Sequence, residues 1–568
     1  MTTWQPARVA VARGPRGLLR RVDLRHPVAV ATLLAAVLHV LWALYLAKDS
    51  GDMAAQYAWT EFIKAHPSAS YNLSWYGGMH PASYSILSPY IMAALGVRMT
   101  GVIAGTLTAT FSAALLMRSQ VKRPLVPVLW TTFALWGDVV SGRVTFALGM
   151  LFAVVATLAL YPGERTTRGR SPRLVLATAM AAFATMCSPV AGLFLLVVAA
   201  ALFLTGRRKD AYILAAAPPV VVGATSLLFP FYGVQPFKWY FAIIPFGVSV
   251  ATALAVPKAW KAIHLGSWVY ALGVVLTFIV PSPIGSNVER LALLYGGTIL
   301  LIVAMASTWG TKRSLLVWLA FAGTASWQIA KPIVDQVTTA STSSSVQHAS
   351  SLIHELHSLH ADRGRVEVVP LRSHWEASGL SPYVNLARGW NRQADVERNP
   401  LFYDGTLTAD TYRDWLRRWS VNYVVLPSVA QPDGAAVAEA KLVAAGQPWM
   451  TEVWHDTDWQ VYSVAGADPM ADPPAVVDQA GPAELTVTMP NSGSVLLRIP
   501  WSPVLGIEGA TDNDSGCLAP DGDWTRLYAP KAGTYKIGGT YALIRGTQCD
   551  KAQIEDGTGR KPTSSSGG

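Results

Sequence analysis

Two carboxylates, Asp49 and Asp52, stand directly after the first long apolar segment of this 568-residue sequence. Ionisable groups at the mouth of a membrane bundle are costly, so they usually serve chemistry or ion handling. A carboxylate there could act as a general base that takes a proton from an attacking hydroxyl. Asp is also a favoured N-cap, so Asp52 could instead cap the helix expected at 53–65. The sequence leaves both interpretations open for Asp52, and the same two for Asp49.

A second acid and several cations precede or follow later apolar segments. Asp138 and Arg143 flank a short turn and can simply pair with each other. Alternatively, Asp138 helps to bind a cation, and the planar guanidinium of Arg143 holds a phosphate. Arg290 either pairs with neighbours beside Glu289 at a helix start or reaches an anionic group in a polar cavity. Lys238, within Q-P-F-K-W-Y, is a further cation on the same expected side.

The segment W-Y-G-G-M-H-P at 75–81 adds aromatic and imidazole groups. His80 could donate to a phosphate or a sugar hydroxyl, or could be an ordinary turn histidine. Trp75 and Tyr76 could stack on a sugar ring, but aromatic belts at membrane interfaces explain such residues without any function. Each signal is weak alone. Their joint appearance on one expected face of a membrane favours a functional interpretation.

The composition divides the chain into two parts that must position these residues. The chain is 51% hydrophobic and 14% charged, whereas soluble domains carry roughly 25% charged residues. Apolar segments with short basic breaks fill 27–331, and the later sequence resembles ordinary soluble protein. The net charge of +10 comes largely from the N-terminal arm and from short loops. Such residues set topology beside anionic lipid, so we expect a lipid bilayer as partner and no nucleic acid.

Basic residues decide how the apolar segments thread the membrane. A spanning helix needs about 20 residues. Segment 81–97 contains Pro89 and polar residues, so we expect it to lie along the outer surface or to dip in and return. Basic loops then fall on one side, which predicts a multi-pass protein of the cell (plasma) membrane with a cytoplasmic N-terminus. The eleven predicted spans are 27–47, 99–117, 124–138, 143–161, 173–187, 189–205, 211–229, 239–256, 262–280, 289–308 and 314–331.

Strand and helix patterns divide the rest of the chain. Helices alternate with strands first, which indicates a small α/β unit, and strands alone follow from about 480. Cys517 and Cys549 could form a disulfide if this region is extracytoplasmic. The predicted divisions are a cytoplasmic basic arm (1–26), a transmembrane domain (27–331) with an outer-face loop (48–97), a linker (332–350), an extracytoplasmic α/β domain (351–470), a β-sandwich-like domain (480–555) and a disordered tail (556–568).

Three short elements resemble the C-type (GT-C) membrane glycosyltransferases. They are G-D at 51–52, M-H-P-A-S-Y at 79–84 and G-D at 137–138. That class includes protein mannosyltransferases, the lipid A aminoarabinose transferase and actinobacterial arabinofuranosyltransferases. The resemblance implies that Asp52 is the catalytic acid of the first outer loop, that Asp138 is the second-loop acid, and that His80 and Pro81 form the family's His-Pro element.

The same resemblance implies the substrates and leaves the cofactor open. The donor would be a polyprenyl-phosphate sugar, and the acceptor a glycan, lipid or protein outside the cytoplasm. Ala82 replaces the second proline of the His-Pro element, and neither Asp52 nor Asp138 belongs to an Asp-x-Asp or Asp-Glu pair. A divalent cation, Mg or Mn, is therefore an open question, and no other cofactor is expected.

The sequence thus predicts a polytopic α-helical, GT-C-like membrane domain of about 11 spans, followed by an extracytoplasmic α/β plus β-sandwich region. Its predicted activity is glycosyl transfer by direct displacement. The alternative is a multi-span transporter or lipid flippase of the cell envelope, and a non-catalytic scaffold is a third class. Transporters often show repeated halves, which this sequence lacks, and rarely need so long an outer tail.

Overall fold

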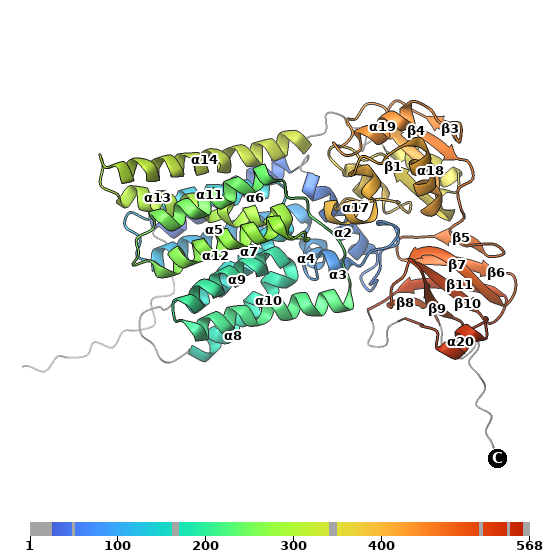
Figure 1. The fold of residues 1–568 in the computed structure, drawn as a ribbon, viewed down its shortest axis with the longest axis horizontal. Coiled ribbons are helices and arrows are strands. Elements are labelled where there is room, and N and C mark those ends of the chain that lie inside the picture. The colour runs from blue at the N-terminus through green and yellow to red at the C-terminus, as the bar shows by residue number, and fades with distance from the viewer. Residues whose placement is uncertain are drawn as a thin grey trace, which may run out of the picture.

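The computed structural model describes residues 25–47, 51–161, 170–339, 349–509, 515–541 and 546–559. Helices fill the N-terminal part, and two lobes that contain β-sheets form the C-terminal part. Figure 1 shows the helical bundle and these lobes side by side along the long axis of the molecule. The predicted succession of a helical region and a β-containing region is confirmed.

A helix occupies each of the eleven apolar segments. Among the described residues, five helical stretches are long and apolar enough to cross a membrane, namely Pro27–Leu46, Val97–Arg118, Arg208–Leu228, Lys261–Ile279 and Gly285–Ala306. The full count of eleven spans stays a prediction. The helices are α1 (Pro27–Leu41) continued by η1 (Trp42–Leu46), α5 (Val97–Arg118), α6 (Leu125–Val140), α7 (Val144–Leu160), α8 (Arg170–Cys187), α9 (Pro189–Leu204), α10 (Arg208–Leu228), α11 (Trp239–Ala255), α12 (Lys261–Ile279), η2 (Gly285–Glu289), η3 (Ala292–Gly296), α13 (Gly297–Ala306) and α14 (Lys312–Thr339).

Segment 81–97 contains short helices, as the basic-residue pattern requires. They are α3 (Pro81–Tyr84) and α4 (Ser88–Leu95), and α5 begins at Val97. Proline stands at the start of both short helices, where its missing N–H costs no hydrogen bond. Eight residues cannot cross a bilayer, so the structure confirms that this segment is not a continuous spanning helix. The other helix of the outer loop is α2 (Gly51–Ala65).

Small residues let the helices of the bundle approach one another closely. A side chain at Gly105 would strike the ring of His39, and one at Gly101 would strike the ring of Trp42. Both rings are fully buried between α1 and α5. Cys187, the one cysteine without a disulfide, is also buried, as expected for a packing residue.

Helix α14 differs from the sequence prediction at its C-terminal end. We expected the linker 332–350 to begin at residue 332, but the helix continues through Pro332 to Thr339. An interior proline weakens a helix, yet Pro332 packs so closely on Gly137 of α6 that a Cβ there would meet its ring at 2.9 Å. Residues 340–348 lie outside the described residues. The longer helix brings Lys331 and Asp335 onto one helical turn.

The first C-terminal lobe is built on a mixed four-stranded sheet with the order β1-β2-β4-β3. Strand β1 is parallel to β2, and the other pairs are antiparallel. We call this part the α/β lobe. Its elements are α15 (Ser350–Ser358), β1 (Arg365–Val368), α16 (Trp375–Leu380), α17 (Arg392–Arg398), α18 (Ala409–Arg418), β2 (Val421–Pro427), α19 (Val437–Ala444), β3 (Met450–His455) and β4 (Trp459–Val464).

The second lobe is a β-sandwich of sheets β5-β6-β11-β8 and β7-β10-β9. Along β6, Leu485, Val487 and Met489 are buried, and the threonines between them are more exposed, so alternate side chains form the core. The Cys517–Cys549 disulfide is present. The elements are β5 (Val476–Ala480), β6 (Glu484–Met489), β7 (Gly493–Pro500), β8 (Leu505–Ile507), β9 (Cys517–Asp521), β10 (Trp524–Ala529), β11 (Gly533–Gly539) and α20 (Lys551–Glu555).

Residues 66–80 of the first outer loop pack between these two lobes. The N–H of Ser70 donates to Gly539 O at 2.8 Å, and that of Leu73 donates to Pro482 O at 2.7 Å, both in the β-sandwich. On the other side, the N–H of Leu386 in the α/β lobe donates to Ser74 O at 3.3 Å. The loop that follows α2 is therefore held by chain segments about 300 to 470 residues later in the sequence.

Candidate active site

Four separate elements meet at the end of the helical bundle that faces the C-terminal lobes. These are the first turn of α2, the turn between α6 and α7, the segment at 289–290, and the last part of α14. Figure 1 shows α2 and the end of α14 on this side of the bundle. The sequence predicted that the first three would share one face.

The centre of this cluster is the guanidinium of Arg143, which is 8% exposed. Its Nη1 donates to Asp138 Oδ1 at 3.4 Å, and its Nη2 donates to Asp335 Oδ2 at 3.1 Å. Asp52 Oδ2 lies 4.0 Å from Nε, and Glu289 Oε1 lies 4.0 Å from Nη2. Asp138 and Arg143 thus pair with each other, as one alternative held, and the pair is part of a larger network.

Lys331 supplies a second cation to the same cluster. Its ammonium contacts Asp335, one turn later on α14, and lies 3.8 Å from Glu289 Oε1. We call Asp52, Asp138, Arg143, Glu289, Arg290, Lys331 and Asp335 the carboxylate cluster. Removal of one partner from a buried ion pair typically costs about 3–5 kcal/mol. The cluster therefore fixes the relative positions of the helix ends that supply it.

Asp52 differs from the other three carboxylates in its exposure. Its side chain is 45% exposed, whereas those of Asp138, Glu289 and Asp335 are 4%, 9% and 22% exposed. Helix α2 begins at Gly51, so Asp52 lies inside the first turn and the N-cap interpretation is wrong. A carboxylate there is stabilised by the helix dipole. It is the acid of this cluster most open to solvent.

Gln56 positions Asp52 against the turn between α6 and α7. Its side-chain amide donates to Gly142 O, and its Oε1 accepts from the N–H of Thr145 at 3.2 Å. The side chain is buried, and its Nε2 also donates to the backbone oxygen of Asp52 at 3.0 Å. The NH₂ group and the oxygen of the Gln56 side-chain amide both form hydrogen bonds. The start of α2 therefore has little freedom to move away from Arg143.

Arg290 is the cation of the cluster with the weakest pairing. Its Nη2 donates to Asn287 Oδ1 at 2.6 Å, and its Cζ lies 5.0 Å from the centre of the Phe146 ring. Among the described residues, no carboxylate lies within ion-pair distance of Arg290. Arg290 as a whole is partly buried, and its guanidinium can bind an anion such as a phosphate without breaking an ion pair.

Tyr84, the last residue of M-H-P-A-S-Y, also faces this region. Burial raises the pKa of its hydroxyl, which hydrogen-bonds with Thr145 and lies in the field of Asp52 and Arg290. The hydroxyl therefore stays protonated and can donate a hydrogen bond. The sequence contained this residue in a recognised element, but no feature of the pattern assigned it a role.

The structure places His80 apart from the carboxylate cluster. It is 5% exposed, and its ring nitrogens lie 2.9 Å from Ser70 O and 3.1 Å from Ser502 Oγ. The imidazole thus joins the first outer loop to the β-sandwich at the turn before α3, which agrees with the turn-histidine alternative, and the donor role stays a prediction.

Trp75 and Tyr76 are fully buried, so the sugar-stacking prediction for them is wrong. The ring of Trp75 packs on Gly389, where a Cβ would approach it to 2.5 Å. The Tyr76 hydroxyl lies 3.0 Å from Gly389 O and accepts from the N–H of Asn391 at 3.0 Å. Because both rings pack against the α/β lobe, these two residues do not form part of an aromatic belt at a membrane interface.

One other predicted residue, Lys238, lies outside the cluster. Lys238 is exposed before α11, and its ammonium lies 6.0 Å from the centre of the Tyr240 ring without a described contact to the cluster. Asp49 lies outside the described residues. Lys331 and Asp335 were missed, although two opposite charges one turn apart at the end of an apolar segment could have indicated them.

The carboxylate cluster does not fit a divalent cation as its side chains are placed. In the described parts of the chain, no three His, Cys, Asp or Glu side chains converge as metal ligands. The guanidinium of Arg143 instead occupies the space between four carboxylates. We therefore derive no chemical step through a metal, and the Mg or Mn expectation stays a prediction.

Comparison with known proteins gives one family match and several similar structures. A family model described as a domain of unknown function (DUF8823) matches residues 472–554, most of the β-sandwich. No curated protein matches the chain.

The similar solved structures are membrane glycosyltransferases of the C type, the class that the sequence motifs resemble. Arabinofuranosyltransferase AftD from Mycobacteria is 16% identical with a TM-score of 0.48, and the match covers 78% of this chain and 40% of AftD. ArnT from Cupriavidus metallidurans is 12% identical with a TM-score of 0.43, covering 78% of this chain and 99% of ArnT.

A third similar structure is an oligosaccharyltransferase from Archaeoglobus fulgidus. It is 10% identical with a TM-score of 0.46, and the match covers 72% of this chain and 70% of that protein. The chain spans less than half the length of AftD. All three TM-scores are below 0.5, so these similarities alone do not indicate what the chain does.

Proposed function

We propose that this protein is an integral membrane glycosyltransferase that moves a sugar from a polyprenyl-phosphate donor to an acceptor outside the cytoplasm. The observation that supports it is the half-exposed carboxylate of Asp52 beside Arg143 and Arg290. A hydroxyl acceptor requires a base, and a lipid-phosphate leaving group requires a cation that is free to bind it. Asp52 and Arg290 offer these two groups at the end of an apolar bundle.

The proposed reaction is a single displacement. Asp52 takes the proton of the acceptor hydroxyl while that oxygen bonds to the anomeric carbon of the sugar. The bond between that carbon and the phosphate oxygen breaks, and its electron pair leaves with polyprenyl phosphate. Arg290 stabilises the negative charge of the phosphate, and Arg143 holds Asp52 and Asp138 in register. No covalent enzyme intermediate is needed.

The placement of the site supports an extracytoplasmic reaction. The cluster and the two C-terminal lobes lie at the same end of the bundle. The basic loops of the sequence predict that this end is outside the cytoplasm. A disulfide in the β-sandwich fits the same side, because such bonds persist mainly in oxidising compartments.

The experiment that tests the function is glycosyl transfer by the Asp52→Asn variant. Membranes that contain the full chain are supplied with a panel of polyprenyl-phosphate pentoses and hexoses carrying radiolabelled sugar. We expect Asp52→Asn to lower the rate of label incorporation by at least about 100-fold, at unchanged protein level.

The matched control is Glu61→Gln on the same helix. Glu61 is exposed and pairs only with the neighbouring Lys64, at 2.8 Å, among its described contacts, so transfer should stay at the wild-type rate. Equal transfer by wild type and Asp52→Asn would remove Asp52 from the mechanism. Movement of the labelled lipid across the bilayer without a new glycosidic bond would replace the proposal with the transporter or flippase alternative.

A further inference from the structure

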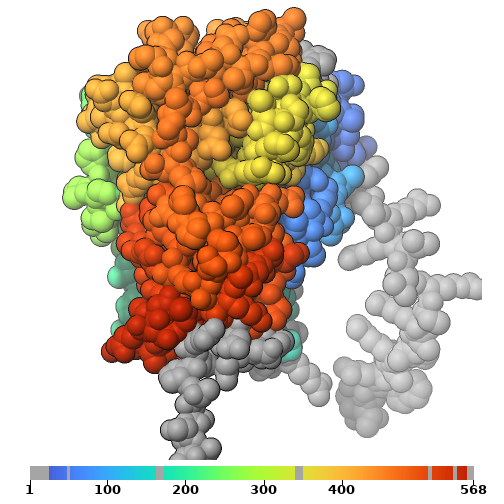
Figure 2. Space-filling view, turned by 90° about the vertical axis from the view of Figure 1, so that its right-hand side faces the viewer, coloured from blue at the N-terminus to red at the C-terminus, as the bar shows by residue number. Residues whose placement is uncertain are grey.

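A cavity of about 350 Å³ lies between the two C-terminal lobes, away from the carboxylate cluster. We call it the lobe groove. Helix α18 forms one wall, and β7 and β10 form the other. Figure 2 shows this end of the molecule, with the α/β lobe above the β-sandwich. The lining residues used below are Asp414, Arg417, Arg418, Asp468, Arg498 and Trp524.

Trp524 gives the groove a fixed aromatic surface. The indole is partly exposed and meets the ring of Trp419 edge to face, with centroids 5.2 Å apart and an interplanar angle of 88°. Trp419 itself is 6% exposed, so the ring of Trp524 packs against a buried side chain. A rigid indole offers a large contact area at a low cost in conformational entropy. It can pack on the C–H face of a sugar ring.

The charged residues of the groove nearly cancel one another. Arg417 pairs with Asp468 at 3.3 Å, and Arg418 pairs with Asp523 at 2.6 Å. Arg498 pairs with Asp472 at 2.6 Å. With Asp414 on the same wall, four acids stand in or beside the groove against three arginines. The groove therefore does not select for phosphate, nucleic acid or an acidic polymer.

These same pairs place hydrogen-bond donors and acceptors side by side. The side chains of Arg417 and Arg418 are 47% and 57% exposed, so both keep N–H groups that face solvent. Exposed ion pairs are weak, about 0–1 kcal/mol, and can exchange partners at little cost. A ligand with many hydroxyls both donates and accepts, which matches guanidinium and carboxylate groups around one aromatic ring.

We propose that the lobe groove binds a neutral glycan. Trp524 contacts a sugar ring, and the arginine–aspartate pairs bond with its hydroxyls. The site is separate from the carboxylate cluster, and binding there needs neither a sugar donor nor Asp52.

One buried side chain connects the groove to the loop that follows the candidate catalytic helix. Arg365 donates through Nη1 to Trp419 O at 2.8 Å, and through Nη2 to Arg498 O at 2.6 Å and Gly77 O at 3.3 Å. It therefore joins both walls of the groove and the first outer loop. A glycan held in the groove is attached to a rigid unit that includes this loop.

The test measures glycan binding by the purified full chain in detergent micelles. The probes are dextran, mannan, linear arabinan and linear galactan, with polygalacturonate as the polyanionic comparison. We expect at least one neutral polymer to bind, and Trp524→Ala to weaken that binding by at least about tenfold, as loss of an aromatic anchor does. Arg417→Gln should weaken it less and should leave folding unchanged because the side chain is exposed.

Two control variants separate this proposal from the others. Tyr383→Ala removes a half-exposed aromatic residue elsewhere on the α/β lobe and should leave binding unchanged. Asp52→Asn should bind the glycan as wild type does, even where it abolishes transfer. The proposal is overturned if no neutral polymer binds, if polygalacturonate binds more tightly, or if Trp524→Ala and Arg417→Gln both bind like wild type.

Discussion

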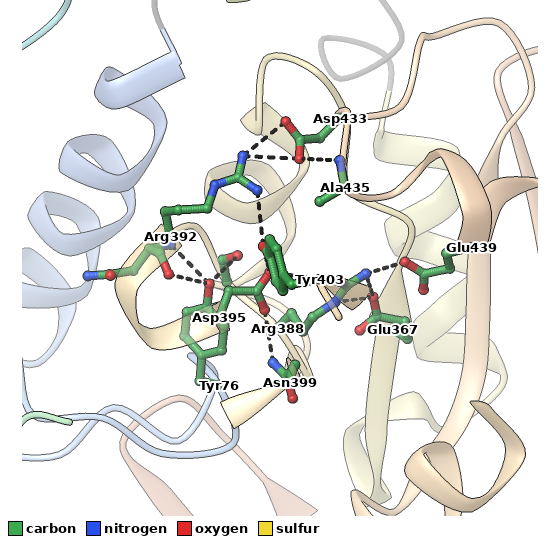
Figure 3. A network of polar contacts seen from close by, with 12 residues as sticks. Tyr76, Glu367, Arg388, Arg392, Asp395, Asn399, Tyr403, Asp433, Ala435 and Glu439 are labelled. Atoms are coloured by element: carbon green, nitrogen blue, oxygen red, sulfur yellow. Dashed lines mark hydrogen bonds and ion pairs between the residues drawn. The ribbon is translucent and has the colours of Figure 1, made fainter. Parts of the chain in front are cut away.

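Two regions of this molecule surround an arginine with carboxylates, and they differ in whether water reaches them. In the α/β lobe, Arg388 Nη2 lies 2.6 Å from Glu367 Oε1 and also contacts Glu439, and its Nη1 lies 3.8 Å from Asp395 Oδ2. Figure 3 shows this network, which continues through Asp395 to Tyr403. The four charged side chains are at most 9% exposed.

The carboxylate cluster around Arg143 uses the same residue types but stays open. Asp52 is 45% exposed, and Arg290 has no carboxylate partner in the described chain. A closed network is shut off from solvent, so it can fix a fold but cannot bind or deprotonate a substrate. The open cluster keeps one acid and one cation for a substrate. This difference, more than the presence of charges, distinguishes a candidate active site from a structural ion network.

The largest predicted effect is the loss of stability when the closed network loses its cation. Burial alone would lower the pKa of Arg388, but Glu367 and Glu439 outweigh it and hold that pKa well above its usual range. Arg388→Met leaves these acids buried and unpaired, and we expect it to cost about 3–5 kcal/mol. Chemical unfolding followed by tryptophan fluorescence measures this loss.

A surface arginine provides the control for that measurement. Arg526 pairs with Asp521 at 2.5 Å, but both side chains are about a third exposed or more. Arg526→Met should change stability by no more than about 1 kcal/mol. If the two variants unfold alike, the network around Arg388 is not the structural element described above.

The open cluster should respond in activity rather than stability. Arg290→Gln leaves no paired carboxylate without its partner, so unfolding should change little. Transfer should fall by about 10²–10³-fold, as when a donor to a developing anion is removed. Arg290→Lys, which keeps the charge but loses the planar fork, should recover part of that rate. Wild-type transfer by Arg290→Gln would contradict the assigned role.

The smallest predicted effect concerns pH and the histidine beside the closed network. His374 is 3% exposed, stacks on Trp390 with centroids 3.3 Å apart, and lies 3.6 Å from Asp433 and 3.7 Å from Glu376. Burial alone would lower its pKa, but hydrogen bonds and charge from these two acids outweigh it, so the pKa is raised above 6.5.

A raised pKa in the folded state fixes the sign of the pH dependence. The stability that protonated His374 contributes is fully present below about pH 6.5, the unfolded value, and is lost as pH rises through the folded value. His374→Gln should therefore destabilise the protein more at pH 5.5 than at high pH, by at most about 1.5–3 kcal/mol. Thermal unfolding of both proteins across this range measures the difference. A gap that is constant with pH would show that His374 has the same pKa in the folded and unfolded states, which would contradict the raised folded value.

Local sequence patterns predicted the helices and four residues of the carboxylate cluster. In the described chain, each of the eleven predicted apolar segments contains a helix, and acids or cations at the segment ends indicated Asp52, Asp138, Arg143 and Arg290. Chemistry at the end of a spanning segment can be recognised because ionisable residues are rare there.

The remaining features depend on contacts between distant segments, which a single sequence does not reveal. Pro332 and the polar residues after it indicated a linker, but packing against Gly137 keeps α14 helical and brings Asp335 to Arg143. Trp75, Tyr76 and His80 read as loop residues that face solvent or substrate. They are buried because segments beyond residue 385 cover them.

The packing of residues 66–80 between the lobes gives the C-terminal half a part in building the candidate catalytic end. Ala69 forms a bridge with Thr540, so a stretch next to α2 completes the edge of a sheet encoded near the opposite terminus. A chain cut after the bundle would expose the indole of Trp75 and the phenol of Tyr76, and α2 would lose the contacts that support it. We expect the helical half, when produced by itself, to fold incorrectly at the end that carries α2. Chimeras should therefore exchange the outer loop together with both lobes.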